Sequence, residues 1–118
     1  MDAAADPLEQ EKLRLCARLA EIECEQARRR GMFQSVPHYN EIEDAGRNLG
    51  RLVSRVTQGR LATEVAAGEQ VARECPTCGR TCRVKVVPRS VTGLDGPTKI
   101  LEPKAHCSAC RRAFFPSA

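Results

Sequence analysis

The first part of the chain repeats its apolar residues with the spacing of an amphipathic α-helix. Residues 6–9 are typical of a helix start: an acidic cap, a proline at the first helical position and a glutamate three residues after the cap. Three arginines followed by Gly31 are typical of a helix end. We expect a helix over about residues 7–30. Its stripe of large side chains comprises Leu8, Leu15, Leu19 and Ile22, and beside it lie the mostly smaller Leu13, Ala17, Ala20, Cys24 and Ala27.

A second helix is expected over about residues 41–72. Residues 40–43 offer a capping box, and Gln58-Gly59 is a point where the helix can end or bend before it resumes. Two such helices would form an antiparallel pair that buries its apolar stripes together or against a second copy. The apolar residues at helical spacing here are Ile42, Ala45, Leu49, Leu52, Val53 and Val56.

The pattern changes at Cys75, after which β-branched residues alternate with basic ones. Asp95-Gly96 lies between two such runs and predicts a β-hairpin, while Pro88 and Pro103 indicate edge positions or bulges. We expect a three-stranded antiparallel sheet. The predicted fold class is therefore α+β, with a pair of N-terminal helices in residues 1–74 and a small antiparallel domain in residues 75–118.

Two C-x2-C knuckles flank this β-rich region and predict a metal site. The ligands would be Cys75, Cys78, Cys107 and Cys110, and four thiolates make a closed tetrahedral site for one structural Zn²⁺. Strands that leave one knuckle and return to the other describe a zinc ribbon. Two redox-active disulfides or a rubredoxin-like iron site are the alternatives for the same cysteines.

The remaining cysteines and histidines receive no ligand role. Cys82 is expected to stay a thiol on a strand, and His106 to be a surface residue or to lie beside the ligands. Cys16 and Cys24 are expected to be small buried apolar residues of the first helix.

The formal charge of +4 is distributed unevenly along the chain. Residues 75–118 contain eight basic and two acidic side chains, which indicates a polyanionic partner, with DNA first. Phe114 and Phe115 are expected to pack on the ribbon as its small core. The candidate phosphate-binding residues are Arg80, Arg83, Lys85, Arg89, Lys99, Lys104, Arg111 and Arg112.

The start of the chain is small and acidic, and no apolar run approaches the roughly 18 residues of a membrane span. We expect a cytoplasmic protein with reduced thiols and no membrane partner. No nucleophile–base pair, phosphate-binding loop or acidic triad is visible, so we do not expect an enzyme.

The ordered motifs resemble the N-terminal region of bacterial insertion-sequence transposases of the ISKra type over about residues 40–118. The matching segments are Cys-Pro-Thr-Cys-Gly-Arg at 75–80, Arg-Ser-Val-Thr at 89–92, Gly-Pro at 96–97, His-Cys-Ser-Ala-Cys at 106–110 and Phe-Phe-Pro at 114–116. The sequence departs from that pattern at Lys104-Ala105, where two tyrosines are common, and at Arg111, where glycine is usual.

The resemblance implies a zinc-ribbon DNA-binding module without the RNase H-like catalytic domain, either a fragment or a stand-alone remnant. The alternative is a zinc-stabilised protein-interaction module whose N-terminal helices form a homodimer or bind a partner protein. A rubredoxin-like electron carrier is the third hypothesis.

Overall fold

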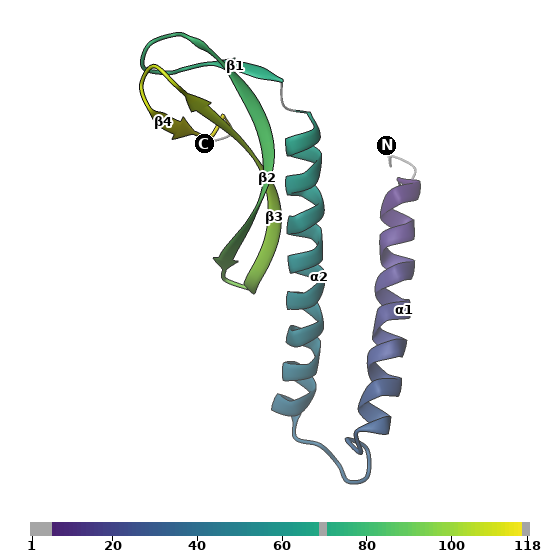
Figure 1. The fold of residues 1–118 in the computed structure, drawn as a ribbon. Coiled ribbons are helices and arrows are strands. Elements are labelled where there is room, and N and C mark those ends of the chain that lie inside the picture. Colours follow the sequence, from purple (N-terminus) through teal and green to yellow (C-terminus); the bar gives the residue numbers. More distant parts are fainter. Residues whose placement is uncertain (1–5, 69–70, 117–118) are drawn as a thin grey trace. The chain divides into compact units, whose positions relative to one another are not determined.

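The computed structural model describes residues 6–68 and 71–116. The chain divides into two compact units, Met1–Leu49 and Gly50–Ala118. Figure 1 shows two helices followed by four strands. The predicted α+β class is confirmed, whereas the predicted domain division before Cys75 stays a prediction.

Helix α1 spans Pro7–Arg29, close to the expected bounds. Asp6 caps it by accepting a hydrogen bond from the backbone N–H of Leu8 at 3.0 Å. At the other end Gly31 has a φ of 85°, and the N–H of Met32 donates to the carbonyl of Ala27. This is a Schellman motif, in which a glycine in the left-handed region satisfies the last carbonyls of the helix.

Helix α2 spans Tyr39–Ala67 and differs from the prediction at both ends. It begins before the expected cap at Asn40, and it continues through Gly59 without a break. Its last residue is Ala67, and the N–H of Gly68 donates to the carbonyls of Glu64 and Val65, so the expected extension to Ala72 is wrong. Neither described helix contains a stretch that is both long and apolar enough to cross a bilayer.

The helices bury little of their apolar surface. Ala27 and Ala66 are their only buried residues. An apolar cavity of about 380 Å³ separates part of α1 from the start of α2, so the helices meet loosely there. The expectation that Cys16 and Cys24 are buried is wrong, because both thiols are exposed.

The sheet has four antiparallel strands, one more than expected, in the order β1-β2-β3-β4. The long hairpin consists of β2 (Thr81–Gly93) and β3 (Gly96–Cys107). The short strand β1 (Ala72–Glu74) pairs with the start of β2, and β4 (Arg112–Phe114) pairs with the end of β3.

The predicted hairpin is confirmed, with its turn one residue earlier than expected. Gly93 pairs with Gly96, and Leu94 and Asp95 form the turn. Gly96 has a φ of 103°, whereas neither turn residue has a positive φ. The turn is therefore not one with two left-handed residues, and the pairing beyond it continues residue by residue without a bulge.

Three prolines in the hairpin belong to cross-strand residue pairs of the same type. Pro97 pairs with Thr92, Pro88 with Leu101 and Pro103 with Val86. In an antiparallel pair every second rung directs its N–H groups away from the partner strand, so proline removes no hydrogen bond there. Both strands are edges over this length, as Pro88 and Pro103 predicted.

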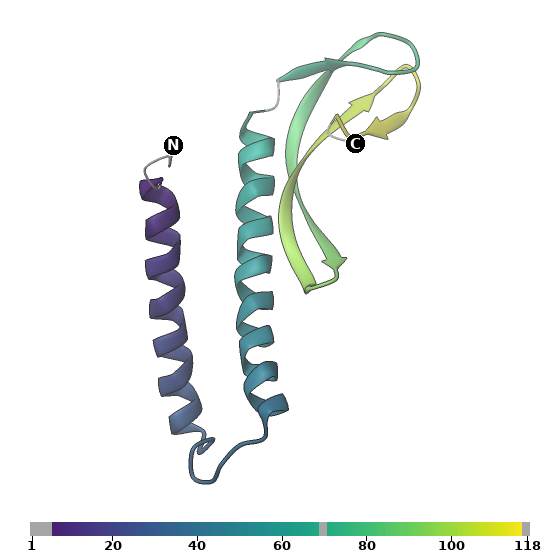
Figure 2. The same cartoon turned by 180° about the vertical axis from the view of Figure 1, so that it is seen from behind.

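The turn of the hairpin is attached to α2 within the second unit. The carboxylate of Asp95 accepts a hydrogen bond from Ser54, and its carbonyl accepts one from Arg55 at 2.8 Å. Gly59 faces the hairpin, where a Cβ would come into van der Waals contact with the carbonyl oxygen of Lys99 at 3.4 Å. Figures 1 and 2 both show the hairpin running alongside this part of α2.

The hairpin buries opposite faces in its two halves. Near the turn, Thr98, Ile100 and Glu102 are at least partly buried, on the side that meets α2. Near the knuckles the buried residues are Pro103, Ala105 and Cys107, which have the other parity and therefore lie on the other face. β2 shows the same change, because Val91 and Val87 are half-buried in one half and Val84 and Cys82 are covered in the other.

Candidate metal centre and basic face

Two tight turns position the four predicted ligands. In the first, the N–H of Gly79 donates to the carbonyl of Cys75 at 2.9 Å, and Gly79 has a φ of 76°. In the second, Arg111 occupies the equivalent position with a φ of 57°. Arg111 is the one described non-glycine residue in the left-handed region, which costs about 1 kcal/mol for such a residue.

The four sulfur atoms converge at one point, all within 4.8 Å of one another. The Sγ atoms of Cys75 and Cys110 are 3.8 Å apart, and those of Cys78 and Cys107 are 3.6 Å apart. Zinc–sulfur bonds of about 2.3 Å in a tetrahedron place sulfurs about 3.8 Å apart, whereas a disulfide joins them at about 2.05 Å. The cluster can therefore hold one tetrahedral metal ion, and its four thiolates favour zinc.

Backbone amides in each turn point at the sulfur of its first cysteine. The N–H of Thr77 lies 3.4 Å from Sγ of Cys75, and the N–H of Cys110 lies 3.4 Å from Sγ of Cys107. The amide of Cys110 lowers the pKa of Cys107 to about 6, and the amides of Cys78 and Thr77 lower the pKa of Cys75. These donors stabilise the thiolate form, which is the form that binds metal.

The second cysteine of the second turn behaves in the opposite way. The pKa of Cys110 is raised to about 12, chiefly by hydrogen bonding with Cys78 and secondly by burial. Without a cation, crowded sulfurs cannot all be ionised at once, so they share protons. A divalent metal is the group that resolves this crowding, because it binds all four sulfurs as thiolates.

Cys82 and His106 lie outside the cluster. Cys82 is buried and its thiol donates to the carbonyl of Arg80 at 3.3 Å, and burial raises its pKa. His106 is exposed, and as the neighbour of Cys107 on a strand it points to the opposite face. Phe114 packs against the buried group formed by Cys75, Cys82, Ala105 and Cys107, so its predicted core position is confirmed.

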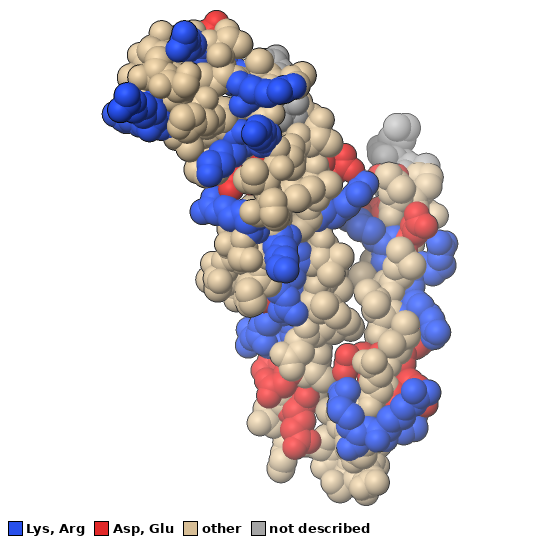
Figure 3. Space-filling model, in the orientation of Figure 1, with Lys and Arg blue, Asp and Glu red and all other residues tan. Residues whose placement is uncertain are grey.

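Three of the predicted phosphate-binding residues share one exposed face of the hairpin, which we call the basic face. Lys85 pairs directly with Lys104 across the two strands. Arg83 and His106 line the same shallow hollow of about 340 Å³. Within residues 6–68 and 71–116, no acidic side chain forms an ion pair with Arg83, Lys85 or Lys104. Figure 3 shows blue side chains spread over the strands with little red among them.

The other candidates do not join this face. Arg89 donates to both carboxylate oxygens of Glu102, at 2.8 and 3.1 Å, and lies 5.8 Å from the ring centroid of Phe115. Lys99 has the opposite strand parity from Lys104 and so projects from the other face. Arg80 and Arg111 belong to the metal-binding turns, and Arg112 belongs to β4. Their roles stay predictions.

His106 is a member of the basic face that sequence reasoning did not place there. Side chains alternate between the two faces of a strand, so His106 lies on the face opposite to Cys107 and on the same face as Lys104. This alternation can be recognised from the sequence.

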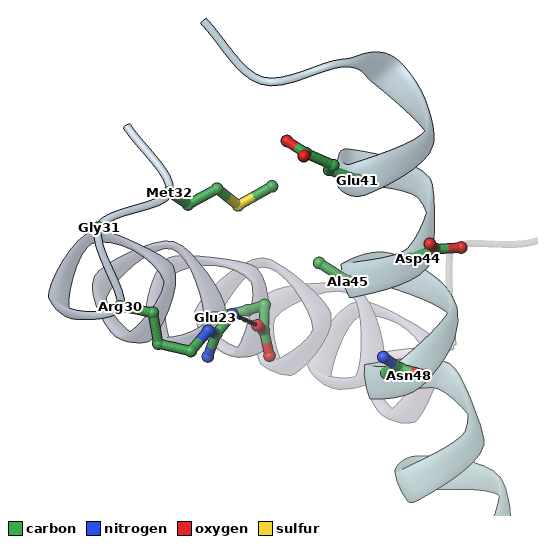
Figure 4. Close-up of a pocket in the computed structure, with 8 residues that line it drawn as sticks. All are labelled: Glu23, Arg30, Gly31, Met32, Glu41, Asp44, Ala45 and Asn48. Atoms are coloured by element: carbon green, nitrogen blue, oxygen red, sulfur yellow. Dashed lines mark hydrogen bonds and ion pairs between the residues drawn. The ribbon is translucent and has the colours of Figure 1, made fainter. Parts of the chain in front are cut away.

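A second hollow, of about 610 Å³, lies between the end of α1 and the start of α2 and is partly acidic. Glu23 is paired with Arg30 at 3.0 Å. In Figure 4 the carboxylate of Glu41 points toward Met32, and that of Asp44 points away from both other acids. The carboxylates do not converge, and in the described part of the chain the four-cysteine cluster is the one group suited to a metal.

Comparison with known proteins yields no assignment, since no family model, no curated protein and no solved structure matches the chain. The fold and the cysteine cluster nevertheless define a class. The chain is an α+β protein whose four-stranded antiparallel sheet bears a four-cysteine metal-binding cluster, and this part is zinc-ribbon-like.

Proposed function

We propose that this chain is a zinc-ribbon module that binds duplex DNA through the basic face of its hairpin. The observation that carries the proposal is the direct pairing of Lys85 with Lys104. Like charges opposite each other destabilise a sheet. A pair of this kind, with no acidic partner in the described structure and with Arg83 beside it, is suited to an external polyanion.

The metal positions this face but takes no part in chemistry. One zinc bound by four thiolates has no open coordination position, so it joins the two turns and holds the hairpin between them. It adds a net charge of −2, which leaves residues 75–118 positive. A two-stranded ribbon is narrow enough to enter the major groove of DNA, and phosphates on the groove walls would neutralise the lysines.

The motif series of residues 75–116 supports a relationship to the zinc-ribbon region of insertion-sequence transposases. In that setting the module would bind DNA for a separate catalytic domain. The proposal includes no strand-transfer chemistry for this chain, since its described acidic side chains do not converge on a metal-binding group.

The test compares two double variants of equal charge change. Lys85→Gln with Lys104→Gln removes the basic face. Arg14→Gln with Arg60→Gln removes two arginines whose ion partners, Glu11 and Glu64, lie on the exposed surfaces of helices. Affinity for a labelled duplex is measured by fluorescence anisotropy over a series of salt concentrations, with zinc-loaded protein throughout.

We expect the wild type to bind with a steep salt dependence. Each lost phosphate contact reduces the slope of log K against log salt by about 0.9, so the Lys85/Lys104 variant should lose nearly 2 and the control pair little. Absence of binding by the wild type at low salt would refute the proposal. Equal losses in the two variants would show that net charge, and not this face, governs binding.

A further inference from the structure

Helix α1 has two apolar faces rather than one broad face. At about 100° per residue, the set of Leu13, Ala17, Ala20, Cys24 and Ala27 is centred about 150° from the set of Leu8, Leu15, Leu19 and Ile22. The two sets thus lie on nearly opposite sides of the helix, and the expectation that they lie side by side is wrong. We call the second set the leucine stripe.

The small-residue face meets the start of α2. Ala20, Cys24 and Ala27 line the apolar cavity shared with Ile42 and other residues of α2, and Ala27 is buried. Most of the leucine stripe receives no such cover, although Leu19 is partly buried. Leu8 is 68% exposed, Leu15 52% and Ile22 39%.

The spacing of the stripe is that of a coiled-coil seam. Its members follow one another at intervals of seven, four and three residues, which keeps them on one line when two helices supercoil. Lys12 occupies the seam position between Leu8 and Leu15, and Gln26 occupies the next one after Ile22. Polar residues in a seam weaken association and restrict its register, so a weak and specific pair is expected.

The charges beside the stripe are self-complementary. Helix α1 carries five acidic and five basic side chains in alternating groups. In a parallel pair, Arg18 lies opposite Glu23 of a second copy, and Glu25 lies opposite Arg30 of a second copy. Within one chain Arg18 pairs with the exposed Glu21, so Arg18 can exchange partners at little cost. Arg30 pairs with Glu23, whose side chain is 24% exposed.

We propose that the leucine stripe is a homodimer interface, in which α1 pairs with α1 of a second copy. A membrane surface would favour an excess of Lys and Arg on the polar side of the helix, and a nucleic acid would favour net positive charge. Helix α1 has neither, because its charges balance. The occupant whose charges match it best is an identical helix.

The test measures the molar mass of the full chain in solution without nucleic acid. Zinc-loaded, reduced protein is examined by sedimentation equilibrium over a wide concentration range. The wild type should pass from monomer to dimer as concentration rises. Leu19→Asp and, separately, Leu15→Asp should each weaken dimerisation by about a hundredfold, because each places a charge where an apolar side chain is buried.

Leu61→Asp is the matched control, since Leu61 is an exposed leucine (60%) on α2. It should leave dimerisation unchanged. Circular dichroism and zinc content must match the wild type in every variant, and Leu15→Asp provides a second, well-exposed position should Leu19→Asp disturb folding.

A wild type that stays monomeric at every concentration would overturn the proposal. So would a dimer that survives both stripe substitutions, because the interface would then lie elsewhere. The assay contains no DNA, so its result is independent of the nucleic-acid proposal.

Discussion

Removal of zinc should unfold the β-sheet of this protein. The buried residues around the sheet are few and small, and Cys75, Cys82, Ala105 and Cys107 form their centre. Two of these four are predicted ligands, so the metal site occupies the place of a hydrophobic core. The large apolar side chains packed against it are Val84 and Phe114, and both are only partly buried.

The size of the effect follows from the coordination. Zinc bound by four cysteines contributes about 10–16 kcal/mol of folding free energy in small zinc-dependent units at neutral pH. A whole ordinary domain has a net stability of about 5–15 kcal/mol. The contribution of the metal is therefore as large as the whole stability of an ordinary domain. Without zinc, the folded fraction of the sheet should fall below detection.

The assay starts with metal content by mass spectrometry, where one zinc per chain is expected. A strong chelator is then added while ¹H–¹⁵N spectra are recorded. The dispersed amide resonances of β2 and β3 should collapse on chelation and return when zinc is restored. Cys107→Ser should give the collapsed spectrum from the outset, because three thiolates and a hydroxyl bind zinc far more weakly.

Cys82→Ala is the matched control, since Cys82 is as buried as the ligand Cys75 but lies outside the cluster. It should lose its hydrogen bond to the carbonyl of Arg80, at a cost of about 1 kcal/mol, together with the packing of its buried sulfur, and should keep its zinc. A dispersed spectrum from metal-free wild type would refute the reasoning. Iron in place of zinc, with visible colour, would instead favour the electron-carrier hypothesis.

Four further substitutions test individual features by chemical denaturation of zinc-loaded protein. Gly79→Ala should lower the free energy of unfolding by about 1 kcal/mol through its positive φ alone, because a Cβ there has open space. Arg111→Gly should leave that free energy unchanged or raise it by up to about 1 kcal/mol, since glycine adopts a positive φ without strain. Equal effects at the two turns would contradict this account. Thr98→Val should stabilise by about 1 kcal/mol, since the buried Thr98 hydroxyl has no hydrogen-bond partner in the described structure, and a loss of stability would show that it has one. Lys85→Glu should stabilise the fold by about 0.2–1 kcal/mol, because it turns a repulsive pair with Lys104 into an attractive one. The same substitution should abolish DNA binding. A variant that binds DNA as well as the wild type would count against the basic face.

The parts of the fold that sequence reasoning predicted well are those set by local signals. The cap at Asp6, the stop at Gly31 and the hairpin glycine at 96 each act within a few residues. The cysteine cluster is equally local in its halves, because each knuckle positions two sulfurs through its own turn. Because antiparallel strands connect the two knuckles, their four sulfur atoms come together around one point, where a single ion can bind.

The features that were missed depend on contacts between distant segments. Strand β1 forms because residues 72–74 pair with residues 81–83, and that pairing outweighs the helical spacing that extended the prediction to Ala72. The exposure of Cys16 and Cys24 likewise depends on how much of α1 its neighbour covers, which periodicity does not report. By contrast, the placement of the two apolar faces on opposite sides of α1 can be calculated from the sequence alone, with the rotation of about 100° per residue of an α-helix.

The exchange of buried faces along the hairpin explains how a sheet this small exposes a basic face. By strand alternation Arg83 and Lys85 lie on the same face as Val87 and Val91, so a hairpin packed on that face throughout would cover them. Instead the half near the knuckles directs its opposite face into the metal cluster, which leaves the side bearing Lys85 and Lys104 uncovered. A metal ion held by the cluster would thus decide which residues can contact a ligand, without contacting those residues itself. Loss of zinc should consequently abolish DNA binding with all basic residues intact, and binding that survives chelation would place the interface outside the hairpin.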